Sequence, residues 1–217
     1  MEMGKSWMLP IDKTYSLVTQ LEGLEELKQA ASGKQGIILL APHLSNWEIF
    51  GMYACQNIVS TFMYQPPKLP ALDRLLQRTR SRGGMKLAPA DRKGVSLLLK
   101  ALQRGEMVGV LPDQVPNDEG GVFANFFGKQ ALTMTLVSKL VARSQARVFC
   151  GFVVRLPKSG GFKLTIREAD KSIYDEDLIT SVSGLNKSVE NCVLTAVEQY
   201  QWEYKRFRRQ SDGEKFY

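Results

Sequence analysis

The sequence predicts an α/β fold in which a largely parallel central sheet is flanked by helices. Apolar runs without polar alternation, at 37–40 and 107–111, are typical of strands that are buried on both faces of a parallel sheet. Amphipathic segments with helical spacing separate these runs, and an alternation of strands with helices favours this fold class. Ligands in such folds bind beyond the carboxyl ends of the strands. We therefore expect functional side chains directly after the buried runs.

The other elements follow in order along the chain. A strand is expected at 14–20, where β-branched and aromatic residues cluster, and a helix at 21–32, where leucines recur with the helical period. Ser45 and Glu48 match the N-cap and N3 positions of a capping box, so another helix is expected to begin there. The remaining expected strands are 58–64, 85–88, 147–155 and 162–168, and the remaining expected helices are 70–82, 93–104, 133–144 and 185–207. The polar, proline- and glycine-containing stretch 115–121 predicts a loop.

Length and composition limit the class of protein. With 217 residues the chain is long enough for one sizeable core, and we interpret residues 1–217 as a single domain. The apolar fraction of 44% and the charged fraction of 24% are typical of a folded globular protein, which argues against a disordered or fibrous chain. The net charge of +7 favours anionic partners, namely phosphates, acidic proteins, acidic lipid surfaces or nucleic acid, without choosing among them.

The cysteines predict buried thiols rather than a disulfide framework or a metal site. Cys55, Cys150 and Cys192 are odd in number and widely spaced, and a single histidine accompanies them. No run reaches the roughly 18 uninterrupted apolar residues of a membrane-spanning helix, and the first ten residues lack the apolar core of a secretory signal. If the protein works on a membrane, these residues are expected to act from its surface.

His43 is the only histidine in the chain, and it follows the strand at 37–40. It is therefore the candidate for a base that acts near neutral pH. Glu48 lies five residues later, and its carboxylate is expected to hold one ring nitrogen so that the other nitrogen accepts a proton. The structural alternative is that Glu48 only completes the capping box and His43 is a hydrogen-bonded loop residue. Asp113 follows the strand at 107–111 and is expected at the same sheet edge as His43.

The motifs around these residues resemble a known family. His-Leu-Ser-Asn-Trp-Glu, at 43–48, is similar to the signature of the glycerolipid and lysophospholipid acyltransferase superfamily, and its Asn-Trp-Glu form resembles the late (lauroyl or myristoyl) acyltransferases of lipid A biosynthesis. Further motifs in the order of that family are Tyr64-Gln65-Pro66-Pro67, Arg80-Ser81-Arg82 with Gly84, Leu111-Pro112-Asp113-Gln114, Gly121-Val122-Phe123, Phe126-Phe127-Gly128 and the stretch 201–207. A series of motifs from about 15 to 207 is far more specific than one motif.

The resemblance implies a glycerol-3-phosphate acyltransferase-like fold and a site for acyl transfer. In that reaction His43, oriented by Glu48, removes the proton of the acceptor hydroxyl in a direct transfer without a covalent enzyme intermediate. Arg80 corresponds to the functional arginine that binds phosphate or stabilises the oxyanion, although a surface arginine is the alternative. Asp113 corresponds to the aspartate that orients Arg80 or the acceptor, with turn initiation before Pro116 as the alternative.

The resemblance also implies partners and a location. The donor is an acyl carrier protein or CoA thioester, a co-substrate rather than a cofactor, and the acceptor is a lipid A precursor or another phosphorylated anionic glycolipid. No metal and no nucleic acid are implied, and the protein is expected on the anionic cytoplasmic face of the inner membrane. Trp202 with three basic residues could meet the lipid there, or form an ordinary solvated basic end; these residues are Arg206, Arg208 and Arg209.

Two features leave alternatives open at the level of sequence. Members of the family usually carry an N-terminal membrane helix, so this chain is expected to be either a trimmed fragment or a short member that binds the membrane through surface residues. Phe123, Phe126 and Phe127 are interpreted first as core and second as the lining of an acyl tunnel. Two rival functions are a noncatalytic module that binds anionic lipid or nucleic acid, and an acyl thioesterase that uses His43.

Overall fold

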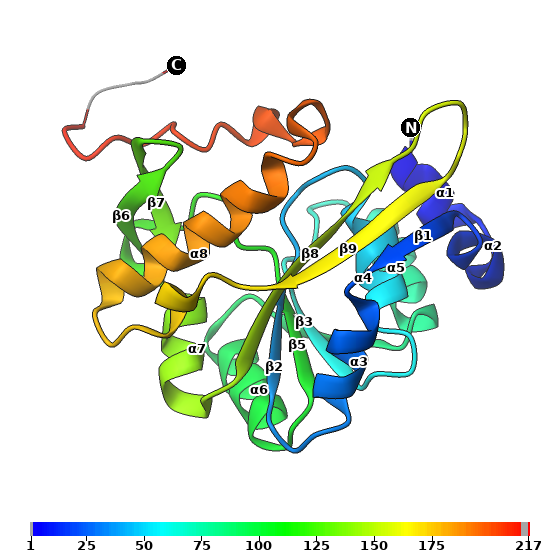
Figure 1. The fold of residues 1–217 in the computed structure, drawn as a ribbon, viewed down its shortest axis with the longest axis horizontal. Helices are drawn as coiled ribbons and strands as arrows, with labels where there is room; N and C mark the ends of the chain where they lie inside the picture. The colour runs from blue at the N-terminus through cyan, green and yellow to red at the C-terminus, as the bar shows by residue number, and fades with distance from the viewer. Residues whose placement is uncertain (1, 214–216) are drawn as a thin grey trace.

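A seven-stranded sheet forms the centre of the computed structural model, which describes residues 2–213 and 217. The strands lie in the order β1-β9-β8-β2-β5-β3-β4 (Figure 1). Their bounds are β1 Val18–Glu22, β2 Ile37–Leu40, β3 Ser60–Tyr64, β4 Met85–Pro89, β5 Met107–Val110, β8 Arg147–Arg155 and β9 Phe162–Glu168. A separate antiparallel hairpin consists of β6 Gly121–Phe126 and β7 Lys129–Met134.

Helices connect the strands and cover both faces of the sheet (Figure 1). Their bounds are α1 Glu2–Met8, α2 Ile11–Tyr15, α3 Leu24–Ala31, α4 Trp47–Ala54, α5 Pro70–Arg82, α6 Arg92–Gln103, α7 Leu136–Ser144 and α8 Leu178–Val193. Short 3₁₀ turns span Asp118–Gly120, Lys171–Tyr174, Val197–Gln199 and Trp202–Tyr204. Within the described residues, none of the helices is long and apolar enough to cross a bilayer.

The expected α/β fold with a largely parallel sheet is confirmed. β2 is parallel to β5 and β8, and β3 is parallel to β4 and β5. The β1–β9 end of the sheet departs from this pattern. β9 is antiparallel to β8, and β1 is parallel to β9, so these two strands run opposite to the others. The carboxyl ends of β2, β3 and β5 consequently meet at one edge.

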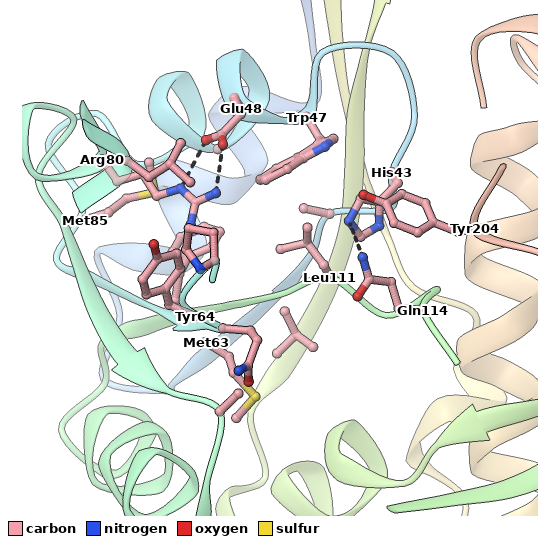
Figure 2. Close-up of a pocket in the computed structure, with 18 of the residues that line it drawn as sticks. His43, Trp47, Glu48, Met63, Tyr64, Arg80, Met85, Leu111, Gln114 and Tyr204 are labelled. Carbon is pink, nitrogen blue, oxygen red and sulfur yellow. Dashed lines mark hydrogen bonds and ion pairs between the residues drawn. The ribbon is translucent and has the colours of Figure 1, made fainter. Parts of the chain in front are cut away.

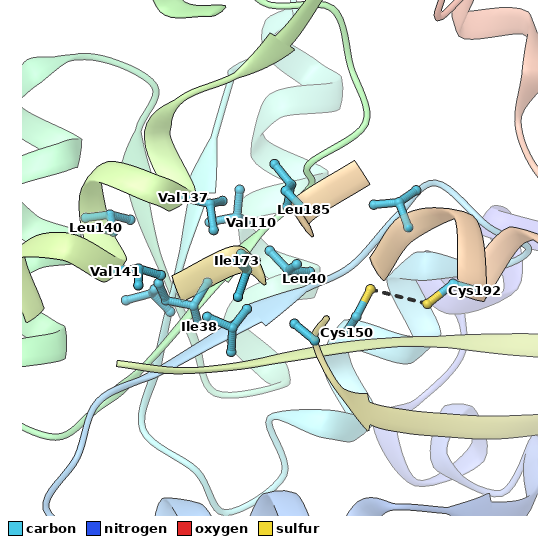
Figure 3. Packing of buried hydrophobic residues seen from close by; sticks show 14 of the residues in the cluster. Ile38, Leu40, Val110, Val137, Leu140, Val141, Cys150, Ile173, Leu185 and Cys192 are labelled. Atoms are coloured by element: carbon cyan, nitrogen blue, oxygen red, sulfur yellow. Dashed lines mark hydrogen bonds between the residues drawn. The ribbon is translucent and has the colours of Figure 1, made fainter. Parts of the chain in front are cut away.

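Alternate residues of β2 supply the two halves of the core. Ile38 and Leu40 belong to the buried cluster that includes side chains of α6, α7 and α8, part of which Figure 3 shows. Ile37 and Leu39 belong to the cluster on the other face, with side chains of α3 and α4. All four side chains are at most 1% exposed. The lack of polar alternation in this strand thus has a simple cause: both of its faces are buried, at about 1.5–3 kcal/mol of hydrophobic stabilisation per side chain.

The three cysteines are buried free thiols, as the sequence predicts. Burial raises the pKa of Cys55 to about 12. The Sγ atoms of Cys150, on β8, and Cys192, on α8, lie 3.3 Å apart in the core (Figure 3). The contact with Cys192, followed by burial, raises the pKa of the Cys150 thiol well above its usual value. The Cys150 thiol is therefore protonated at neutral pH, and both buried side chains pack as small apolar groups.

The first elements begin later than expected. The strand predicted at 14–20 begins at Val18, because residues 11–15 form α2, and the following helix begins at Leu24 rather than at 21. Gly23 separates the two elements with a φ of +76°. A Cβ atom at this position would lie only 1.9 Å from the carbonyl oxygen of Ile166, so both the backbone conformation and the close approach require glycine.

The helix predicted at 133–144 also begins later, at Leu136. Residues 129–134 instead form β7, which pairs along its whole length with β6. The turn between these strands uses Phe127 and Gly128, both with positive φ. The predicted loop at 115–121 is confirmed up to the start of β6, apart from one 3₁₀ turn.

The carboxyl-terminal helix predicted at 185–207 is wrong at both ends. It begins at Leu178, because the Asp177 side chain caps it by accepting a hydrogen bond from Thr180 N–H, and it ends at Val193. We call residues 194–207 the C-terminal segment. This segment crosses the carboxyl edge of the sheet in irregular turns, seen in orange to red in Figure 1. Its backbone is paired with the loop after β2, and such tertiary hydrogen bonds override a local helical preference.

Candidate active site

His43 and Asp113 lie at matching positions after two neighbouring parallel strands. Leu40 at the end of β2 is paired with Val110 at the end of β5, and each polar residue follows three positions later. Nδ1 of the His43 ring lies 2.8 Å from Oδ1 of Asp113. The backbone N–H of His43 also donates to Oδ2 of Asp113, at 2.8 Å. The Asp113 carboxylate therefore holds the histidine at two points.

This contact fixes the tautomer of the histidine. Because an ionised carboxylate only accepts hydrogen bonds, Nδ1 of the neutral His43 ring carries the proton and Nε2 carries the lone pair. Nε2 lies 3.2 Å from Nε2 of the Gln114 side chain, whose amide group donates to it. His43 is 2% exposed and Asp113 is 3% exposed, whereas Gln114 is at the surface. The basic nitrogen is thus covered by a polar side chain that has room to move.

Glu48 is held by Arg80 instead of contacting His43. Nε and Nη2 of Arg80 donate to the two carboxylate oxygens of Glu48, at 3.2 and 2.7 Å. The indole N–H of Trp7, on α1, donates to the same carboxylate at 3.3 Å. Figure 2 shows the carboxylate directed at Arg80 and the His43 ring directed at Gln114. The expected contact between Glu48 and His43 is therefore not formed, and Asp113 takes the orienting position.

The predicted capping box is also wrong. Asn46, rather than Ser45, is the N-cap of α4, and its side chain accepts a hydrogen bond from Ile49 N–H at 3.1 Å. Ser45 has a φ of +52°, and its backbone N–H donates to the carbonyl of Gln199 in the C-terminal segment. The helix consequently begins one residue later than expected, and Glu48 occupies its second position. The structural explanation of Glu48 as a reciprocal capping residue is thereby removed.

Arg80 projects from α5 toward the interior, so the alternative of a surface arginine is not what the structure shows. Its side chain is 12% exposed, and its guanidinium carbon lies 5.3 Å from the centre of the Trp47 ring and 5.0 Å from that of Tyr64. These distances are typical of cation–π contacts, which hold a cation on aromatic surface. The hydroxyl of Tyr64 donates to Asp73 at 2.5 Å, and burial together with this carboxylate raises the pKa of Tyr64 to about 12. Tyr64 is therefore neutral near pH 7.

A cavity of about 320 Å³ joins the two polar groups. Figure 2 shows His43 and Gln114 on one side of it and Arg80 with Glu48 on the other. Most of the wall between them is apolar; it includes Phe62, Met63, Met85, Val110, Leu111 and Met134. An apolar chamber with a few convergent polar groups is typical of a site for an amphipathic ligand.

Aromatic side chains that the sequence did not assign to the site surround His43. The ring centres of Trp47 and Tyr204 lie 5.3 and 4.6 Å from that of His43. Tyr204 belongs to the C-terminal segment, and burial raises its pKa. The only sequence signal for Trp47 is its place between Asn46 and Glu48 in the motif, and the only signal for Tyr204 is the resemblance of 201–207 to a family motif.

Two of the three phenylalanines near the hairpin, Phe126 and Phe127, pack in or against the core as first interpreted, whereas Phe123 is half-buried and belongs to neither buried cluster. Phe126 is fully buried in the main cluster, and Phe127 packs against that cluster. Phe123, Phe126 and Phe127 are not among the described residues that line the cavity. Within the same described part of the chain, no group of three or more histidine, cysteine, aspartate or glutamate side chains is arranged to hold a metal ion.

Comparisons with known proteins give the family. Residues 1–209 match the family described as bacterial lipid A biosynthesis acyltransferase. The chain is 28% identical over 98% of its length to a lipid A biosynthesis lauroyltransferase of Escherichia coli K12, and 28% identical over 98% to a lipid A biosynthesis palmitoleoyltransferase of the same strain. It is 32% identical over 90% of its length to a lipid A biosynthesis acyltransferase of Haemophilus influenzae.

These matches cover 69%, 69% and 61% of the respective relatives, so the chain spans about two thirds of their length. The family match, by contrast, extends over nearly the whole of this chain and includes both polar groups of the cavity. The chain therefore belongs to the bacterial lipid A biosynthesis acyltransferase family.

Proposed function

We propose that the protein transfers an acyl chain from an acyl carrier protein or CoA thioester to a hydroxyl of a lipid A precursor or a related anionic glycolipid. The observation that carries this proposal is the oriented His43–Asp113 pair on an apolar cavity that also contains a buried cation, Arg80. The names of the relatives support the acceptor class. The alternation of helices with a parallel sheet supports a glycerol-3-phosphate acyltransferase-like arrangement.

In the proposed reaction, Nε2 of His43 is the general base. It takes the proton of the acceptor hydroxyl as that oxygen attacks the thioester carbonyl, so a carbon–oxygen bond forms. The tetrahedral intermediate then breaks its carbon–sulfur bond, and the proton on Nε2 passes to the leaving thiolate. The Gln114 amide that covers Nε2 must give way to the acceptor hydroxyl, which its exposed position permits. No covalent bond to the enzyme is needed, because the cavity brings both substrates together.

Asp113 and Glu48 have different roles in this proposal. Asp113 holds the proton on Nδ1 of His43 and stabilises the imidazolium that forms during the reaction. Glu48, for which the sequence suggested the orienting role, is a positioning residue that fixes the guanidinium of Arg80. Arg80 supplies positive charge for a phosphate of the acceptor or for the oxyanion. Backbone N–H groups at the start of α4 are the other proposed oxyanion donors.

The proposed partners follow from the same arrangement and from the surface. An acyl chain fits the apolar wall of the cavity, and a phosphorylated glycolipid fits its cation. We further propose that the protein works at the cytoplasmic face of the inner membrane, where the net charge of +7 favours an anionic surface. The exposed side chains of Trp202 and Arg208, both near the carboxyl end of the chain, support this placement.

An acceptor-dependent thiol-release assay tests the proposal. Purified protein is mixed with an acyl carrier protein thioester, with and without a phosphorylated glucosamine lipid, and the acylated product is identified by mass spectrometry. Thiol release is expected to depend on the acceptor and to be abolished by His43→Ala. A matched control is Glu106→Gln, which alters an exposed ion pair with Arg104 and is expected to leave activity unchanged. Full activity in His43→Ala would overturn the mechanism.

The same assay separates the rival functions. A thioesterase would release thiol equally well without acceptor and would produce a free fatty acid. A noncatalytic lipid-binding module would release no thiol, and its binding would be unaffected by His43→Ala. The oriented histidine favours the transferase, because simple binding has no need for an imidazole whose tautomer a buried carboxylate fixes.

A further inference from the structure

Gly51 lies in the interior of α4, although neither the backbone nor the packing requires a glycine there. Its φ is not in the left-handed region, and α4 continues for three residues beyond it, to Ala54. A Cβ atom at this position would lie 3.8 Å from Cε1 of Phe62 and 3.9 Å from the sulfur of Met85, which are ordinary van der Waals contacts. Glycine destabilises a helix relative to alanine, so this glycine needs another explanation.

Gly109, on β5, is a glycine of the opposite kind in the same neighbourhood. A Cβ atom there would overlap Cε1 of Phe62, so the ring can lie over β5 only because residue 109 has no side chain. Phe62 is 5% exposed, and its ring is thus held firmly on the sheet. Gly109 therefore has a packing role, whereas Gly51 faces the same ring across space that belongs to the cavity.

The part of the cavity beside Gly51 is its closed end. Gly51, Phe62 and Met85 line the cavity and are buried, whereas Gln114 lines it and is exposed, which marks the mouth. Figure 2 shows Met85 on the side of the cavity opposite His43. A ligand whose reacting group lies at His43 thus extends away from the mouth, toward the closed end.

We propose that Gly51 is a specificity-determining residue that sets the longest acyl chain the protein transfers, an inference that rests on the function proposed above. The thioester carbonyl must lie within reach of Nε2 of His43, which fixes one end of the acyl chain. The other end then meets the Phe62 ring and the Met85 thioether, in space that the missing side chain of Gly51 leaves open.

The chemistry of the closed end favours an acyl chain over the sugar of the acceptor. Phe62 and Met85 offer a sugar hydroxyl no hydrogen-bond donor, so burial of a hydroxyl between them would be unfavourable. Each methylene group buried there adds hydrophobic stabilisation. A donor chain that just reaches the closed end therefore binds best, and a longer chain does not fit without displacing its thioester from His43.

Gly51→Ala shortens this space by one methyl group without a clash. We expect kcat/KM for the longest chain that the native protein uses well to fall by about tenfold relative to the chain two carbons shorter. The melting temperature should rise by about 1–3 °C, because alanine favours the helix. A gain in stability together with a selective loss for long chains distinguishes a specificity role from a structural one.

Competition between donors measures this ratio directly. Acyl carrier protein thioesters of saturated chains that differ by two carbons are mixed with one fixed glycolipid acceptor, and the products are counted by mass spectrometry. The matched control is Gly4→Ala, because Gly4 lies in α1 and a Cβ atom there would have no other atom within 4 Å. This control should leave the ratio unchanged. Met85→Ala enlarges the closed end and should move the ratio toward longer chains.

A binding measurement covers the same point without catalysis. Free fatty acids of the same series should protect the native protein against thermal unfolding, and the longest protective chain should be shorter for Gly51→Ala. A product ratio at the native value in folded Gly51→Ala overturns the role of Gly51, as it would if a chain of the acceptor filled the closed end. Failure of the proposed function is a different result: no acyl transfer by the native protein from any donor, or full transfer by His43→Ala.

Discussion

Two buried carboxylates lie beside one cavity and are held by different groups. Asp113 accepts from the ring of His43, and Glu48 accepts from the guanidinium of Arg80. A carboxylate on an imidazole selects a tautomer and stabilises the imidazolium, whereas a carboxylate on a guanidinium neutralises and orients a cation. The difference in partners therefore assigns different chemistry to two carboxylates that the sequence places in separate motifs.

Asp113→Asn tests the first of these assignments. The amide has the same shape, but its NH₂ group can donate a hydrogen bond to Nδ1 of His43. This contact favours the wrong tautomer, in which Nε2 carries the proton and cannot act as the base. We expect kcat/KM for acyl transfer to fall by about 100-fold or more, with little change in the KM of either substrate. Steady-state kinetics and a pH–rate profile would check this. Near-native kcat/KM in a folded Asp113→Asn protein would contradict the orienting role of Asp113.

Glu48→Gln tests the second assignment. It leaves the largely buried guanidinium of Arg80 without its carboxylate, so the free energy of unfolding is expected to fall by about 1–3 kcal/mol. The acid limb of the pH–rate profile should stay in place, because Glu48 does not touch His43. Glu106→Gln is the control for stability, since its ion pair with Arg104 is exposed. A shifted acid limb in Glu48→Gln would instead support the pairing of Glu48 with His43 that the motif suggested.

The members of the site could be found from the sequence, but their pairing could not. His43, Glu48, Arg80 and Asp113 all line or adjoin the cavity, as the series of motifs implies. Nearness in the chain favoured Glu48 as the partner of His43. The register of β2 with β5 makes Asp113 the partner of His43 instead. Leu40 and Val110 are opposite each other in the sheet, and His43 and Asp113 each lie three residues further along the chain. That register depends on sheet order, which local patterns do not encode.

At the scale of elements, buried strands were predicted better than segments that depend on distant contacts. β2, β8 and β9 have the predicted bounds, because strands with uninterrupted burial or clear turns carry a strong local signal. The C-terminal segment was predicted as helix and is irregular. Its conformation is set by hydrogen bonds to His43 and Ser45, more than 150 residues away, and by Arg206. Periodicity in a single stretch carries no information on such partners.

Arg206 is the anchor by which this segment holds the β6–β7 hairpin. Its guanidinium donates to the carbonyl of Leu132 at 2.6 Å and to the hydroxyl of Thr133 at 2.7 Å, and it lies 5.3 Å from the centre of the Phe126 ring. The side chain is 3% exposed, and burial lowers its pKa. A buried cation with these contacts joins the hairpin, α8 and the C-terminal segment into one unit, because Asn186 of α8 accepts from it as well.

Arg206→Met therefore has an expected effect on stability. The variant keeps most of the side-chain length but leaves the acceptors on the hairpin unpaired, so the free energy of unfolding should fall by about 1–3 kcal/mol. Arg208→Met, two residues later and exposed, is the control and should change it by less than about 0.5 kcal/mol. Urea denaturation followed by circular dichroism measures both. Equal stability of the two variants would show that Arg206 does not anchor the hairpin.

At the scale of the whole molecule, apolar and basic groups are exposed on the C-terminal segment. Leu194, Val197 and Trp202 are 64%, 45% and 41% exposed, and the indole N–H of Trp202 donates to the carbonyl of Val197. Lys205 lies in the same segment and Arg208 directly follows it, in a protein of net charge +7. Figure 1 shows this segment at the carboxyl edge of the sheet, whereas α6 lies toward the opposite end. The exposed apolar side chains thus accompany the residues that surround His43.

This placement predicts how the protein meets a lipid surface. Indole rings favour the boundary between headgroups and acyl chains, and lysine and arginine are attracted to anionic headgroups by about 1 kcal/mol each. Trp202→Ser should weaken binding to vesicles that contain anionic lipid by about tenfold in a flotation assay, and added salt should weaken native binding as well. The control is Leu97→Ser, which removes a similarly exposed apolar side chain from α6. If both substitutions weaken binding equally, general surface hydrophobicity rather than the C-terminal segment determines how the protein is oriented on the membrane. If only Trp202→Ser weakens binding, the C-terminal segment contacts the membrane, and the cavity faces the lipid from which the acceptor must come.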